Sequence, residues 1–145
     1  MIQALISLFD RDLNRLKAEL LAYEDESKLW ISQAQISNSA GNLCLHLIGN
    51  LNTYIGATLG NTGYIRHRDL EFSLKDIPRD ELLRKIDETI FVVTNTLSNL
   101  NEDSLKMEYP LLVLKDKTST EYFLIHLSTH LNYHLGQINY HRRLL

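Results

Sequence analysis

Hydrophobic residues recur at intervals of three and four along four long stretches of this chain, a spacing typical of helices that bury one face. The first stretch runs from Ile2 to Tyr23 and keeps its charged residues mostly off the apolar stripe. The third, opened by Pro78, has the most regular spacing and carries no evident chemistry. The predicted helices cover residues 2–23, about 37–59, 78–100 and 121–145.

Two long connections, over residues 60–77 and 101–120, separate these helices. The second contains an apolar run at 109–114, which we expect to be a short strand or a flap over one end of the fold. The pattern predicts an all-α protein, a four-helix bundle formed as one domain over residues 1–145. Either connection could cross the length of the bundle, so loop length alone leaves the topology open.

Composition narrows the function classes only a little. The chain has 145 residues, is 44% hydrophobic and 23% charged, and carries a formal net charge of −3. This balance gives no reason to expect nucleic acid or an anionic membrane as a partner. The N-terminus lacks the features of a signal peptide, no apolar run is long enough to span a bilayer, and Cys44 has no possible partner within the chain. We therefore expect a cytoplasmic location.

Histidines concentrate in the last predicted helix. Four of the protein's 6 histidines fall there, at positions 126, 130, 134 and 141. The first three, His126, His130 and His134, are spaced by four residues, which places their imidazoles along one side of a helix. That side also carries Leu127, Leu131 and Ile138, so we expect these three histidines to point towards the interior.

His46 lies near the middle of the second predicted helix, on a strip of small or polar residues. On a regular helical wheel the strip contains Ser39, Asn42, His46, Asn50, Thr53 and Ala57. Such a strip, free of Lys and Glu, suits a cavity wall that offers hydrogen bonds. The alternative is close helix packing through the glycines of the same helix: Gly41, Gly49 and Gly56.

Together His46, His130 and His134 predict a metal site with three imidazole ligands and a fourth position left to water. No carboxylate joins them by spacing, so the ion would keep its charge and lower the pKa of a bound water or thiol. The alternative is that these histidines only fill the core. The predicted cavity residues around the site are Asn42, Asn50, Thr53, Tyr54, His126, Tyr133 and Gln137.

The remaining candidates lie outside this cluster. We expect His141, beside Arg142 and Arg143, to be a solvated cation at the helix C-terminus. The cluster Arg66, His67 and Arg68 could contact an anionic group of a substrate, or form a plain solvated loop.

Three segments resemble the DinB/YfiT-like superfamily: NSAGNLCLHLIGNLNTYI (38–55), RHRDLEF (66–72) and HLNYHLGQINYHRR (130–143). The resemblance implies an up-down-down-up bundle with its long crossover between helices 2 and 3. It also implies one divalent metal ion, nickel or zinc in many cases, held at positions matching His46, His130 and His134. Similar proteins are commonly homodimers. Many relatives have Arg after the last ligand, where this chain has Leu135.

What is known of the superfamily favours a metal-dependent enzyme acting on a small molecule, with a thiol-dependent transferase ahead of a hydrolase. A low-molecular-weight thiol would then be a second cofactor, and the open metal site would activate it. Two other hypotheses remain open at this point, a bundle that binds a small molecule without turnover and a purely structural bundle.

Overall fold

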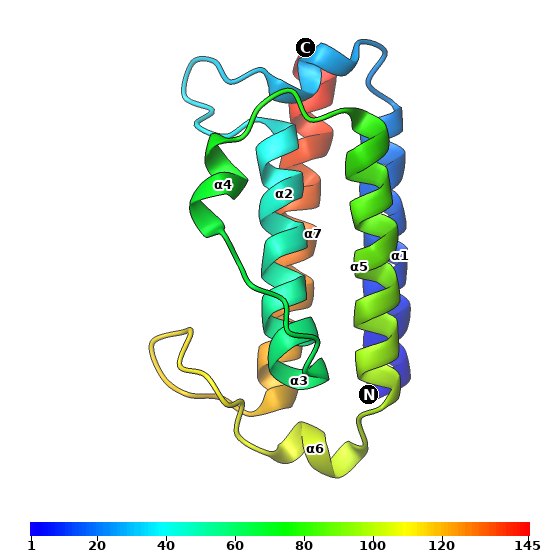
Figure 1. Ribbon diagram of the computed structural model, residues 1–145, viewed down its shortest axis with the longest axis vertical. Coiled ribbons are helices and arrows are strands. Elements are labelled where there is room, and N and C mark those ends of the chain that lie inside the picture. The colour runs from blue at the N-terminus through cyan, green and yellow to red at the C-terminus, as the bar shows by residue number, and fades with distance from the viewer.

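The computed structural model describes residues 1–145, and every regular element in it is helical, which confirms the all-α prediction. Four long helices lie side by side (Figure 1). They are α1 (Ile2–Leu21), α2 (Ala40–Leu51), α5 (Arg79–Ser98) and α7 (Thr120–Leu144). Shorter elements are the 3-10 helix η1 (Glu26–Trp30), the π-helix η2 (Asn52–Ala57), α3 (Thr58–Gly60), α4 (Arg68–Ser73) and α6 (Glu102–Lys106).

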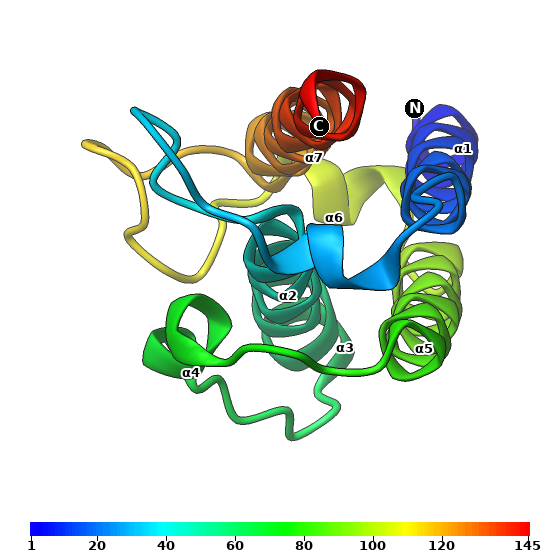
Figure 2. The same ribbon diagram turned by 90° about the horizontal axis from the view of Figure 1, so that it is seen from above.

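The four long helices surround a shared apolar interior, with α1 antiparallel to α5 and α2 antiparallel to α7. Along the vertical axis of Figure 1, α1 and α7 run one way, and α2 and α5 run the other. Seen from above, α1 and α2 each pack between α5 and α7 (Figure 2). None of the helices combines the length and hydropathy that crossing a membrane requires.

The apolar stripes predicted for the first and third helices do face this interior. The buried members of the two stripes are Leu5, Phe9, Leu13, Leu16 and Leu20 on α1, and Leu82, Ile86, Val93 and Leu97 on α5. Burial of these side chains, at about 1.5–3 kcal/mol each, is the main favourable term that holds α1 against α5. These two helices thus provide scaffold for the other pair.

The second predicted helix is continuous but not regular. The Ser39 side chain caps α2 by accepting a hydrogen bond from the Asn42 backbone N–H at 3.2 Å. After Leu51 the chain widens into the π-helix η2, and α3 then ends at Asn61 in the left-handed conformation. A π turn adds one residue per turn, so the regular wheel that placed Thr53 and Ala57 with His46 fails beyond residue 51.

The connection between α3 and α5 contains α4, a helix that the sequence pattern did not predict. We call residues 61–78 the strap, because they run along the outside of α2 from one end of the fold to the other (Figure 1). The Asn42 side-chain amide fastens the strap by donating hydrogen bonds to the backbone carbonyls of Glu71 and Leu74, both at 2.9 Å. Asn42, predicted as a cavity residue, therefore holds α4 against α2.

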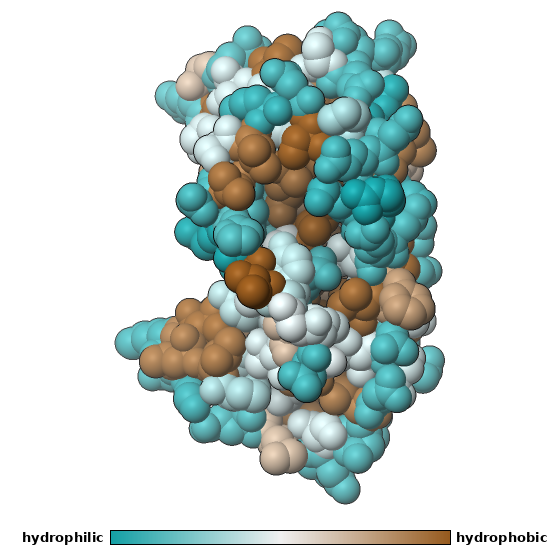
Figure 3. All heavy atoms as spheres, in the orientation of Figure 1, coloured by the Kyte–Doolittle hydropathy of each residue, from teal (hydrophilic) through white to brown (hydrophobic).

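The second connection forms α6 and then a protruding loop. The loop closes at its base through one antiparallel bridge between Glu108 and Ser119, and no longer strand forms. Apolar side chains gather on this projection (Figure 3), where Leu112 is 63% exposed. Ser119 caps α7 by accepting from the Tyr122 backbone N–H at 3.1 Å.

Candidate metal centre

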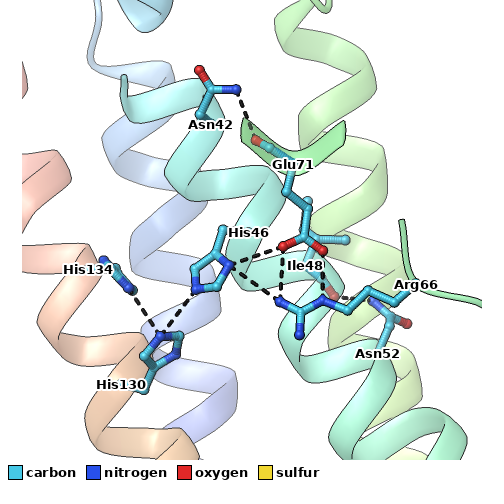
Figure 4. Close-up of polar contacts among 8 residues, drawn as sticks. All are labelled: Asn42, His46, Ile48, Asn52, Arg66, Glu71, His130 and His134. Carbon is cyan, nitrogen blue, oxygen red and sulfur yellow. Dashed lines mark hydrogen bonds and ion pairs between the residues drawn. The ribbon is translucent and has the colours of Figure 1, made fainter. Parts of the chain in front are cut away.

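Three imidazoles from two helices meet in the interior. His46 extends from α2 towards α7, and His130 and His134 extend from α7 to meet it (Figure 4). The Nε2 atom of His130 lies 3.3 Å from Nε2 of His46 and 3.1 Å from Nε2 of His134. A tetrahedral zinc ion with Zn–N bonds of about 2.0–2.1 Å separates its ligand nitrogens by roughly 3.3 Å. Two of the three nitrogen pairs have this spacing, and all three ligand atoms lie within 4.8 Å of one another, so the group could hold one metal ion.

The outer nitrogens of two rings are held by acceptors. His46 Nδ1 lies 3.1 Å from a Glu71 carboxylate oxygen, and His134 Nδ1 lies 2.6 Å from the Gln137 amide oxygen. The Arg66 Nη2 atom also lies 3.4 Å from His46 Nδ1, but it has a closer acceptor in Glu71 Oε1 at 3.0 Å. Because the carboxylate and amide oxygens only accept, hydrogen bonds from both rings to them place the proton on Nδ1 and the Nε2 lone pair inward. Lone pairs at about 3 Å repel one another unless a proton or a cation lies between them.

His130 lies between the other two rings and is the least able to become charged. Its pKa is lowered to about 4, first by burial and then by the charges of His134 and His46. Burial also lowers the pKa of His134, although the Gln137 hydrogen bond acts in the opposite direction. Neutral imidazole is the form that binds a metal ion, and at neutral pH His130 is in that form.

Glu71, on α4, is a site residue that the sequence analysis missed. Its side chain is buried, with 6% of the residue exposed. The Arg66 guanidinium donates to both oxygens, through Nε at 2.8 Å and Nη2 at 3.0 Å (Figure 4). Burial would raise the Glu71 pKa, but the hydrogen bonds from His46 and Arg66 outweigh it and lower the pKa. The carboxylate is therefore ionised and fixed beside His46, the arrangement that orients histidine ligands in many metal sites.

Glycine at position 49 makes the approach of Glu71 possible. A Cβ atom on Gly49 would lie 1.9 Å from Glu71 Oε2, far inside any contact distance. The other two glycines of this helix meet neighbours in the same way, Gly41 against the Trp30 ring and Gly56 against Val92. Close packing through glycine, one of the two interpretations of the second predicted helix, is thus seen at all three glycines, against the strap at Gly49, against η1 at Gly41 and against α5 at Gly56.

A sequence comparison places the chain in a family. A family model described as a protein of unknown function, DUF1572, matches residues 2–145. The chain belongs to DUF1572. No curated protein matches it.

Of the other predicted cavity residues in this DUF1572 protein, two line the space beside His134. Tyr133 and Gln137 border a cavity of about 490 Å³ together with the His134 ring. The Tyr133 and His134 ring centroids are 5.4 Å apart. These two residues thus lie where a molecule next to the candidate metal centre would touch them.

The remaining predicted cavity residues lie one turn or more from the trio, towards the start of α7. The His126 ring stacks between Phe123 and His130, with centroids 5.8 Å and 6.4 Å away, and takes no part in the nitrogen group. Tyr54 packs edge-on against Phe123 at 5.5 Å. Asn50 Oδ1, Thr53 Oγ1 and His130 Nδ1 are buried without a hydrogen-bond partner in the protein. This end of the site is polar but incompletely satisfied.

The basic cluster of the strap is only partly available to a substrate. Arg66 is occupied by Glu71, whose hydrogen bonds and charge raise the Arg66 pKa against the lowering effect of burial. The Arg68 guanidinium lies over the Phe72 ring, 5.4 Å from its centroid, and His67 is exposed. An anion contact through His67 or Arg68 stays a prediction.

The expectation that His141 is a solvated cation was wrong. Only 5% of His141 is exposed. Its Nε2 lies 2.8 Å from the Ile31 backbone carbonyl, and its Nδ1 lies 2.6 Å from the Tyr23 hydroxyl. The carbonyl can only accept, so Nε2–H donates to it and Nδ1 accepts from Tyr23. Neighbouring arginines suggested solvent, but the two partners come from segments more than 100 positions away, which spacing cannot reveal.

Proposed function

We propose that this DUF1572 protein binds one divalent metal ion through His46, His130 and His134 and is a thiol-dependent transferase of the DinB-like type. One observation carries the proposal. The Nε2 atoms lie 3.1 and 3.3 Å apart while Glu71 and Gln137 hold the Nδ1 protons on the opposite sides of two rings. If these histidines only filled the core, we would expect their ring nitrogens to face protein donors or acceptors of hydrogen bonds. Here the Nε2 atoms face one another instead.

The proposal also includes the bundle topology that the resemblance to the DinB-like superfamily implies. The antiparallel pairing of the long helices and the strap between α3 and α5 support the proposal of an up-down-down-up four-helix bundle with its crossover between the second and third long helices. The identity of the ion as nickel or zinc, the low-molecular-weight thiol, the homodimer and the cytoplasmic location come with this proposal, on the resemblance alone.

The side chains around the proposed centre have different roles. Glu71 and Gln137 fix the orientation of two imidazoles, and Arg66 keeps Glu71 ionised and in place. A divalent ion held by neutral imidazoles supplies positive charge that lowers the pKa of a thiol or water beside it. In the proposed reaction the thiol sulfur bonds to an electrophilic carbon, the leaving group departs with the bonding electron pair, and the thiol proton passes to solvent.

The surroundings favour thiol transfer over hydrolysis. Glu71 is the one carboxylate at the centre, and its hydrogen bonds with His46 and Arg66 leave it a poor general base. Attack by water benefits from a base, whereas a thiolate formed at neutral pH needs none. If the thiol assay fails, the result would point to a hydrolase or to a bundle that binds a small molecule without turnover.

Two measurements test the proposal. Purified protein loaded with Zn²⁺ or Ni²⁺ should retain about one ion per chain, and His46→Ala, His130→Ala and His134→Ala should each lose it. His126→Ala is the matched control, a histidine of the same helix that should leave the stoichiometry unchanged. Loaded protein should then consume a chromogenic electrophile only when cysteine, glutathione or another small thiol is added. Full metal binding by the triple-alanine variant would refute the site.

A further inference from the structure

A cavity of about 490 Å³ adjoins the candidate metal centre, between the loop that precedes α2 and the C-terminal half of α7. In the view from above, this loop lies beside α7 (Figure 2). His134 contributes to the cavity wall, and it is the one member of the histidine trio that does. The volume falls within the range of about 300–1,000 Å³ that small-molecule sites occupy.

The lining of this cavity carries no lysine, arginine, aspartate or glutamate. Its polar groups are amides and a hydroxyl on the loop side, from Gln35, Ser37 and Asn38. Nearby, the Arg143 guanidinium lies over the Tyr140 ring at 5.3 Å from the centroid but does not line the cavity. A charged ligand group would thus lose part of its water without gaining a charged partner, which disfavours its binding.

Two aromatic rings border the same cavity. Tyr133 is 65% and Tyr140 is 64% exposed, although both rings are large apolar surfaces. Below them Leu43 contributes apolar surface that is itself almost fully buried. A flat apolar group placed here would cover surface that the protein leaves in contact with water.

The loop that forms the opposite wall is held in place at its beginning. His141 Nε2 donates to the carbonyl of Ile31, and the Ser32 hydroxyl donates to the carbonyl of Ile36 at 2.7 Å. At the other end Ser39 is fixed as the cap of α2. The cavity is therefore bounded by chain that the fold positions before any ligand binds, which lowers the entropic cost of binding.

We infer that this cavity is the substrate site of the proposed metal centre, and that it takes an uncharged molecule with a flat apolar ring and a polar group directed past His134 towards the ion. The inference rests on the proposed function and adds a substrate class to it. It places substrate recognition on Tyr133, Tyr140 and the 35–38 loop, away from the basic residues of the strap.

Three hydroxamates test this inference on zinc-loaded full-length protein, because a hydroxamate binds zinc through its two oxygens whatever group it carries. Acetohydroxamate lacks a ring, benzohydroxamate adds an uncharged ring, and 4-carboxybenzohydroxamate adds a charge to that ring. Calorimetric titration should show benzohydroxamate binding at least tenfold tighter than acetohydroxamate, since burying roughly 100 Å² of ring supports a gain of this size or larger. The carboxylate analogue should lose most of that gain.

Variants locate the effect. Tyr140→Ala and Ser37→Trp should each reduce the benzohydroxamate advantage at least threefold while acetohydroxamate binding is unchanged, and both positions are exposed enough for the fold to tolerate the change. Tyr122→Ala is the control, an exposed tyrosine of α7 that does not line the cavity.

Equal affinity for the three hydroxamates, tightest binding of the carboxylate analogue, or insensitivity to both cavity variants would overturn the inference and leave the metal centre standing. Protein that takes up no zinc would overturn both, and the stoichiometry measured before titration separates the two failures.

Discussion

Replacing Gly49 by alanine should weaken metal binding without touching any of the three imidazoles. The added Cβ would lie 1.9 Å from Glu71 Oε2, and ordinary contact begins at 3.4 Å, so the carboxylate must retreat by the difference, about 1.5 Å. It then loses the hydrogen bonds that now join it to Arg66 at 2.8 and 3.0 Å and to His46 at 3.1 Å. His46 keeps its place on α2 but loses the group that orients its ring.

The size of the effect follows from these contacts. Loss of an outer-shell partner of a histidine ligand typically costs 10–100-fold in metal affinity, which corresponds to about 1.4–2.8 kcal/mol. Stability of the metal-free protein should fall as well, because Arg66 loses two charge-assisted hydrogen bonds of about 1.5–3 kcal/mol each. Part of this lost stability is regained, because the freed groups bind water and because alanine has a helix propensity about 1 kcal/mol better than glycine. We expect a net loss of roughly 1–3 kcal/mol.

Gly136→Ala supplies the matched control for this prediction. It is also a glycine-to-alanine change within a long helix, but an added Cβ there meets nothing within 4 Å. It should raise stability by up to about 1 kcal/mol and leave metal affinity unchanged. Competition with a chromophoric zinc chelator gives the affinity of both variants, and urea unfolding gives their stability. Wild-type affinity in Gly49→Ala would refute the claim that Glu71 orients His46.

Three further predictions concern the rest of the molecule. The His130 pKa of about 4 lies below its ordinary value of 6.5, so the unfolded chain binds the proton first, and metal-free protein should lose stability as pH falls from 6.5 towards 4. Urea unfolding across that range checks the sign, and a rise in stability on acidification would contradict it. Tyr23→Phe removes the hydroxyl that donates to His141 and should lower the free energy of unfolding by about 1 kcal/mol without changing metal stoichiometry. Loss of the ion in this variant would contradict our conclusion that His141 is separate from the candidate metal centre. Asp12→Ala removes a buried carboxylate that accepts from Asn132 on α7 at 3.1 Å, and thermal unfolding should report a loss of about 1–3 kcal/mol.

The sequence was most informative where structure is local and regular. The stripes of α1 and α5 predicted their buried faces, because a long helix repeats its inward positions every three or four residues. Histidines spaced by four on α7 and a single histidine on a polar strip were enough to predict which three histidines come together.

The features that the sequence did not predict depend on tertiary contacts or on a local change in helix geometry. Glu71 lies on a helix of 6 residues, too short for a periodic signal, and it reaches His46 only because Gly49 leaves room. The π-helix η2 changed the helical phase in a stretch whose composition looks ordinary. His141 was misjudged because its partners, Tyr23 and the Ile31 carbonyl, come from the opposite end of the chain.

The strap gives the candidate centre a mechanical connection to the exterior. Glu71 is anchored to His46 on one side and, through its own backbone carbonyl, to Asn42 on the other, so an ordered strap and well-oriented ligands are two aspects of one equilibrium. If detaching residues 61–78 lowers the affinity for the ion by some factor, thermodynamic reciprocity requires that a bound ion lower the opening equilibrium of this segment by the same factor. Bound metal should then protect the segment against proteolysis. The rate at which a protease cleaves this surface segment should therefore report whether an ion occupies the candidate centre.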